Sequence, residues 1–145
     1  MSEIVKWRFD GRYDADPTKC KQEIESIGDD VKPQQIVDYA KNPDTELHKC
    51  FTWDNDVAAE KWRLYEARQV VCSLVIVETN SDDEDIQIRA FHKVNNDEGY
   101  KSFRIILKNK DEYEKLLERC LSDLRALKNK YQNLSEYQEI WDLIH

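Results

Sequence analysis

The sequence predicts a mainly helical α+β fold: an antiparallel sheet of three or four strands, an N-terminal trio of helices and two C-terminal helices. Glycine and proline number only three each in 145 residues, and 36% of the residues are charged, which favours helices. Some segments alternate apolar and polar side chains, which is typical of strands. In others the apolar residues recur every three or four positions, which is the spacing of amphipathic helices.

A strand and a short helix are predicted first. Residues 4–9 alternate as in a half-buried strand, whose inward side chains are Val5, Trp7 and Phe9. Asp16 is suited to cap a helix and Pro17 to occupy its first position, so a helix begins there. Gly28 provides its C-terminal cap.

A trio of helices is predicted between residues 33 and 69. Pro33 begins the first helix, Thr45 caps a single further turn, and Asp54 caps a long helix that ends at about Gln69. Short turns join the three, as in compact helix-turn-helix units.

Three antiparallel strands are predicted within residues 70–107. Residues 70–77 are β-branched and almost continuously apolar, as in a central strand buried on both faces. Residues 86–93 alternate and form the next strand. After a turn at residues 95–99, a last strand is predicted over residues 102–107.

Two helices are predicted at the C-terminal end. Asn109 caps the first, which carries a heptad seam of about two and a half repeats. The seam residues are Tyr113, Leu117, Cys120, Leu124, Leu127 and Tyr131. Ser135 and Gln138 cap the second helix.

No repeat or linker interrupts the chain, so residues 1–145 are predicted to form a single domain. Its parts are a helical subregion at about 17–69, a sheet at about 70–107 and C-terminal helices at about 110–145.

The amino-acid composition limits the possible binding partners and the cellular compartment. The net charge of −8 and the pI near 4.9 oppose non-specific binding to nucleic acid or to an anionic membrane. No signal peptide or membrane-spanning apolar stretch is recognisable, which indicates a cytoplasmic protein. Four cysteines without a C-x-x-C pair are expected to be buried free thiols: Cys20, Cys50, Cys72 and Cys120.

The sequence shows no signature of an active site, so a non-enzymatic protein without a cofactor is expected. A glycine-rich phosphate loop is excluded because the three glycines stand far apart. The three histidines are isolated, which argues against a metal site. The acidic run at residues 82–85 lacks the glycine and spacing of a calcium loop and is expected to be a solvated hairpin loop.

Two surfaces are candidates for binding. The long helix presents Lys61, Arg63 and Arg68, and it is either a DNA-reading helix or scaffold. The hairpin after residue 86 is predicted to show cations interleaved with aromatic rings, which suits single-stranded nucleic acid unless the terminal helices cover that face. The hairpin candidates are Arg89, Phe91, Lys93, Tyr100 and Arg104.

One segment resembles a pattern in small uncharacterised proteins of tailed phages and prophages. The pattern reads Leu-His, Phe-x-Trp-Asp, Ala-Ala, Arg, Ala-Arg, and a weaker likeness covers residues 121–136. The matching positions of the first motif include Leu47, His48, Phe51, Trp53, Asp54, Ala58, Ala59, Trp62, Arg63, Ala67 and Arg68. Asn55 stands where a second aspartate often follows in that family.

The resemblance implies a phage accessory protein in the host cytoplasm and names no active residues. Phe51, Trp53 and Trp62 are expected in the core or a partner pocket, and Arg63 or Arg68 is expected to pair with Asp54.

Three hypotheses follow. The chain binds nucleic acid; or its acidic surface inhibits a host nucleic-acid-processing protein such as a defence nuclease; or it is an assembly protein that forms homodimers through the heptad helix. An exposed heptad seam would favour the last.

Overall fold

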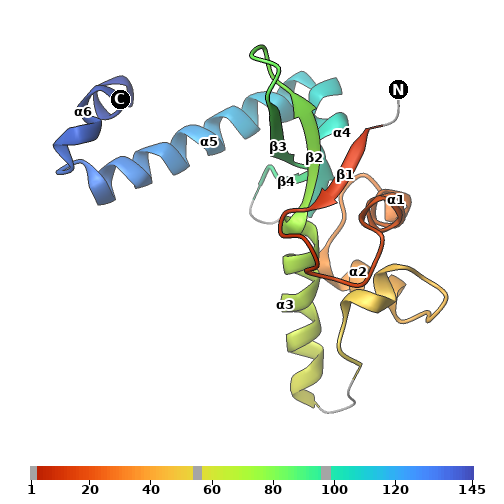
Figure 1. Cartoon of the computed structure of the whole chain (residues 1–145). Coiled ribbons are helices and arrows are strands. Elements are labelled where there is room, and N and C mark those ends of the chain that lie inside the picture. The colour runs from red at the N-terminus through yellow and green to blue at the C-terminus, as the bar shows by residue number, and fades with distance from the viewer. Residues whose placement is uncertain (1–2, 54–56, 96–98) are drawn as a thin grey trace. The chain divides into compact units, whose positions relative to one another are not determined.

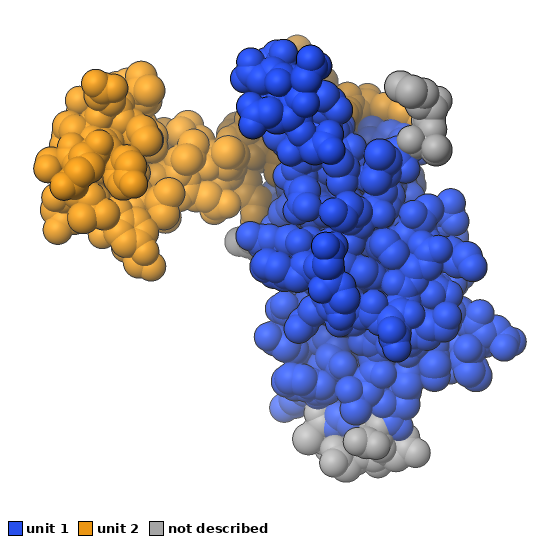
Figure 2. Space-filling view, in the orientation of Figure 1, with its two compact units in different colours: residues 1–105 blue, residues 106–145 orange. Residues whose placement is uncertain are grey.

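The computed structural model describes residues 3–53, 57–95 and 99–145, and it confirms the α+β class (Figure 1). The chain divides into two compact units, residues 1–105 (unit 1) and residues 106–145 (unit 2) (Figure 2). The assignment of the whole chain to a single domain stays a prediction.

Unit 1 holds most of the elements. The described residues of its first half form a strand and four helices, β1 (Ile4–Trp7), α1 (Pro17–Ile27), α2 (Pro33–Ala40), the 3-10 helix η1 (Leu47–Cys50) and α3 (Val57–Ser73). Its second half contains four strands and the start of a helix, β2 (Leu74–Thr79), β3 (Asp85–Arg89), β4 (Phe91–Lys93), β5 (Tyr100–Ser102) and α4 (Phe103–Lys108).

The strands of the described residues form two antiparallel sheets. The first has the order β1-β2-β3, with Ile76 of the central strand opposite Val5 on one side and Ile88 on the other. The second is the hairpin of β4 and β5, in which Phe91 lies opposite Ser102. Ala90 joins the two sheets, since its N–H donates to the Leu74 carbonyl and its own carbonyl accepts from Phe103.

Local chemistry explains where several elements begin. The Asp16 carboxylate accepts hydrogen bonds from the N–H groups of Thr18 and Lys19, which confirms it as the N-cap of α1. Asn109 caps the next long helix in the same way, accepting from the N–H of Glu112. Proline occupies the first position of both α1 and α2, where its missing N–H costs nothing.

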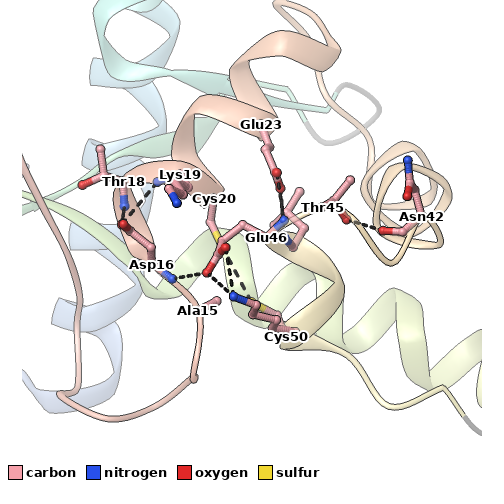
Figure 3. Close-up of polar contacts among 12 residues, drawn as sticks. Ala15, Asp16, Thr18, Lys19, Cys20, Glu23, Asn42, Thr45, Glu46 and Cys50 are labelled. Atoms are coloured by element: carbon pink, nitrogen blue, oxygen red, sulfur yellow. Dashed lines mark hydrogen bonds and ion pairs between the residues drawn. The ribbon is translucent and has the colours of Figure 1, made fainter.

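Carboxylate contacts from Glu23 and Glu46 fasten η1 to α1 (Figure 3). Glu23 accepts from the N–H groups of Glu46 and Leu47, each at 2.9 Å, and so satisfies the otherwise unpaired start of η1. Glu46 in turn accepts from the N–H of Asp16 at 2.7 Å, and this bond, with Lys49 beside it, lowers the pKa of Glu46. The hydrophobic core of unit 1 lies beneath these contacts and includes Ile24, Ile36, Val71, Leu74 and Phe91.

The predicted strand over residues 70–77 is wrong in its first half. Helix α3 continues to Ser73, and the strand begins at Leu74. Val70 and Val71 are β-branched, but both are fully buried on the inner face of α3, so packing overrides their strand propensity.

The predicted strand over residues 102–107 is also wrong. The strand ends at Ser102, and Phe103–Lys108 forms α4. The Ser102 hydroxyl accepts from the N–H of Ile105, as a helix N-cap does, and Ile106 is the buried residue of the turn that follows. The predicted strand over residues 86–93 is interrupted at Ala90, and the predicted inward Phe9 is 63% exposed because β1 ends at Trp7.

Unit 2 contains the end of α4 and three further helices, α5 (Lys110–Tyr131), η2 (Ser135–Tyr137) and α6 (Gln138–Leu143). The end of the chain packs back on α5. Trp141 and Ile144 are buried, and the indole N–H of Trp141 donates to the Leu134 carbonyl. Arg125 and Lys128 of α5 donate to the carbonyl oxygens of His145 and Ile144, each at 2.7 Å.

The expectation of four buried cysteines is wrong for two of them. Cys20 and Cys50 are buried, with their sulfur atoms 3.9 Å apart. Cys72 is half-buried, and Cys120 is exposed because it lies on the seam of α5.

Candidate functional site

The structure brings four of the motif residues together: His48, Phe51, Trp53 and Arg63. The His48 ring lies parallel to the Trp53 indole, with centroids 4.7 Å apart, and the Arg63 guanidinium lies 5.1 Å from the Trp53 centroid. Phe51 is buried, and its ring centroid is 5.5 Å from that of Trp53. These contacts join the segment after η1 to α3, so the motif residues support the fold.

Hydrogen bonds complete this stack. Trp53 donates its indole N–H to the His48 carbonyl, and His48 Nδ1 lies 2.8 Å from the Ala40 carbonyl. Arg63 is only 6% exposed; it donates to the Thr52 carbonyl and forms an ion pair with Glu60 at 3.1 Å. Arg63 is thus held inside the fold, where a nucleic-acid phosphate has no access to it. Asp54, the expected cap of α3 and partner of Arg63 or Arg68, lies outside the described residues.

The predicted open hairpin face is not formed. Phe91 and Tyr100 are 1% and 7% exposed because the break at Ala90 turns β4 and β5 toward the core. A ring buried in this way is not available to stack on a base. Arg104 lies in α4, where it forms an ion pair with Glu3 at 3.4 Å.

Other predicted residues do come together on the outer side of α3. Trp62 and Tyr65 stack with ring centroids 5.1 Å apart, and they are 53% and 48% exposed. Lys61 and Arg68 are exposed on the same side of the helix, since positions three and four apart share a face. Arg89 of β3 reaches α3 one turn further on, donating to the sulfur of Cys72 at 2.7 Å. We call this surface the aromatic–basic face; it comprises Lys61, Trp62, Tyr65, Arg68 and Arg89.

Arg89 of this face also affects the titration of the neighbouring hairpin of β4 and β5. Burial lowers the pKa of His92, and the charge of Arg89 lowers it further. Burial raises the pKa of Tyr100, whose ring also lies 5.5 Å from the Lys93 ammonium. Arg89 and Lys93 thus lie close to this hairpin, although residues 1–105 carry 15 basic and 22 acidic side chains.

The sequence did not single out Tyr65 as a binding residue, and Trp62 was expected in the core or a partner pocket. A signal was present in the helical spacing. Ala67, Val70 and Val71 mark the inner face of α3, and Tyr65 falls on the opposite side of a helix with 3.6 residues per turn.

The second exposed surface is the heptad seam of α5. None of the 22 residues of α5 is buried. Five of the six predicted seam residues are large hydrophobic side chains that are between 38% and 52% exposed: Tyr113, Leu117, Leu124, Leu127 and Tyr131. Leu121, beside the seam, is 38% exposed. An apolar stripe of this length on a helix without buried residues is typical of an interaction surface.

Among the described residues, no group of three or more histidine, cysteine or acidic side chains could hold a metal ion. No helix in this described part is long and apolar enough to cross a bilayer. The chain matches no protein-family model, no curated protein and no solved structure. Its function is therefore inferred from its own surfaces.

Proposed function

We propose that the chain is a non-enzymatic binding protein that assembles with a second copy of itself through α5. The exposed heptad seam supports this proposal. Seam spacings of four and three residues allow two helices to interlock along their whole length, as in coiled coils. Side chains at such positions are normally covered by a partner helix.

The stability of α5 leads to the same expectation. A helix of 22 residues gains little from propensity alone, and in proteins most helical stability comes from packing an apolar face. The chain end covers only a part of α5 through Trp141 and Ile144. A second α5 would cover the rest of the stripe.

The size of the seam suggests a reversible complex. Four leucines, each 38% to 52% exposed, flank or form the seam: Leu117, Leu121, Leu124 and Leu127. Full burial of a leucine is worth about 2 kcal/mol, so covering the exposed half gives about 1 kcal/mol each and about 8 kcal/mol per dimer. Association itself costs about 4 to 15 kcal/mol. The leucines alone therefore leave at most about 4 kcal/mol, which corresponds to a dissociation constant of about 1 mM. The two half-exposed seam tyrosines add to this, so we expect a weak complex that is partly dimeric at about 500 µM.

Sedimentation equilibrium of the full chain between about 1 and 500 µM tests the proposal. We expect a monomer–dimer equilibrium that shifts to monomer when Leu117 and Leu124 are both changed to serine. Leu143→Ser is the matched control, because Leu143 is 79% exposed but lies on α6. A protein that stays monomeric at 500 µM, or a dimer that the seam variant does not weaken, would contradict the proposal.

We also propose a second function, binding of single-stranded nucleic acid at the aromatic–basic face. Two half-exposed rings beside Arg68 and Arg89 can stack on bases while the guanidinium groups hold phosphates. Glu66, two positions before Arg68 on α3, already accepts hydrogen bonds from Thr52. Because unit 1 is acidic overall, we expect weak binding that depends steeply on salt. A phage setting for either function stays a prediction.

Fluorescence polarisation with labelled single-stranded DNA and RNA at 20 and 150 mM salt tests this second function. Trp62→Ala and Arg68→Gln are each expected to weaken binding about tenfold, since stacking is worth about 1 to 3 kcal/mol per base. Tyr137→Ala is the control, because Tyr137 is a ring of similar exposure in unit 2. Absence of binding at 20 mM salt would refute the nucleic-acid function and leave self-association untouched.

A further inference from the structure

We infer that the two α5 helices of the dimer pair in opposite directions, an inference that rests on the proposed self-association. The first reason is the symmetry of the seam. Its spacings of four, three, four, three and four residues read the same in both directions. Reversing one helix therefore places Tyr113 opposite Tyr131 of the second copy and Leu117 opposite Leu127. The whole seam overlaps in this register, as it also does in a parallel pair, but here each Cys120 packs against the larger Leu124 instead of a second Cys120.

The second reason is the distribution of charge along α5. Residues 111–118 contain four acidic side chains and one lysine, a net charge of −3. Residues 119–130 contain four basic side chains and one aspartate, a net charge of +3. An antiparallel pair sets the acidic segment of each copy against the basic segment of the other, whereas a parallel pair sets like charges together. The helix dipoles also oppose each other favourably only in the antiparallel arrangement.

One flanking pair distinguishes the two orientations. Glu114 directly follows the seam residue Tyr113, and Lys128 directly follows the seam residue Leu127. When the seams pair in the antiparallel register, these two flanking positions lie beside each other across the dimer. Lys128 donates one hydrogen bond to the Ile144 carbonyl, and its ammonium group has two further N–H donors. In a parallel pair, Lys128 would instead lie beside Asp123 of the second copy.

Charge reversal with rescue tests the orientation. Lys128→Glu is expected to weaken the dimer about twofold to fivefold in sedimentation equilibrium, as for an exposed ion pair. Adding Glu114→Lys should restore the original dissociation constant. Rescue by Asp123→Lys in place of Glu114→Lys would show a parallel pair and overturn the inference while leaving the proposed self-association intact.

Oxidative cross-linking of Cys120 gives an independent readout. In a parallel pair the two exposed Cys120 thiols share one layer and lie close enough for a disulfide. In the antiparallel register they are offset by four residues, about 6 Å along axes that lie about 8 to 10 Å apart, beyond the reach of a disulfide. With Cys72→Ser to remove the half-buried thiol, we expect no disulfide dimer under a copper–phenanthroline oxidant. Rapid Cys120 cross-linking in the seam-dependent dimer refutes the antiparallel pair; a monomer in every assay refutes the proposed function itself.

Discussion

The double change of Leu117 and Leu124 to serine is the strongest test of the seam. Leu117 is 52% exposed and Leu124 is 38% exposed, so neither contributes much to the packing of unit 2 by itself. The variant should therefore keep its helix content. Its effect should appear in association, because four leucine side chains per dimer are lost from the interface.

The expected magnitude follows from the exposed fractions. Covering about half of a leucine is worth about 1 kcal/mol, so the two changes remove about 4 kcal/mol from the dimer. Since 1.4 kcal/mol corresponds to a factor of ten, the dissociation constant should rise about a thousandfold. The Leu143→Ser control should change it by less than about threefold.

Sedimentation equilibrium measures the dissociation constant, and far-UV circular dichroism at the same concentrations confirms that the variant is folded. A folded variant whose dissociation constant stays within about fivefold of the original protein would refute the argument from the seam. A loss of helix content at low concentration in the unmodified chain would show that α5 folds as it pairs.

Three further predictions concern unit 1. Glu23→Gln should lower the free energy of unfolding by about 1 to 2 kcal/mol in urea titration, because a charged acceptor for two N–H groups is lost; unchanged stability would contradict the role of Glu23 in holding η1. Gly99→Ala should cost about 1 to 3 kcal/mol, since a Cβ there would overlap the backbone of Val31, and a stable variant would contradict this close approach. The pKa of His92 is lower in the folded protein, so the unfolded chain binds more protons below its ordinary pKa of 6.5; stability should fall as pH drops below 6.5, and less so in His92→Gln.

Local signals in the sequence predicted the starts of α1, α2 and α5, whereas the caps expected at Thr45 and Ser135 are not formed. Asp16, Pro17, Pro33 and Asn109 each supply or permit a helix start through their own side chains, and each helix begins where they place it. These signals act within a few residues, so the sequence alone contains the relevant physics.

The wrong secondary-structure predictions lie where contacts between residues far apart in the sequence determine the structure. Val70 and Val71 have the composition of a strand, but they are buried in the core as part of α3. The residues after Ser102 alternate as a strand would, yet the Ser102 hydroxyl caps a helix there. In both places the local pattern allowed two structures, and tertiary packing selected one of them.

In the candidate sites, too, features set by local sequence were predictable and features set by tertiary packing were not. The spacing of the α5 seam follows from local periodicity, whereas burial of Phe91 and Tyr100 depends on the break at Ala90. Sequence reasoning therefore grouped these rings with Arg89 on a face that the fold does not expose. The exposed rings beside Arg89 belong to α3, and a hydrogen bond from Arg89 to Cys72 links β3 to that helix.

Burial separates the residues that support the fold from those that remain available for binding. His48, Trp53 and Arg63 satisfy one another through stacking and hydrogen bonds, so a change in any of them should reduce stability before it affects a partner. The seam leucines have the opposite character: they are large, apolar and half-exposed, and the described contacts of unit 2 do not bury them. A chain that keeps this much apolar surface on a long helix gains most by covering it with the same surface of a second copy, because one set of substitutions then optimises both partners.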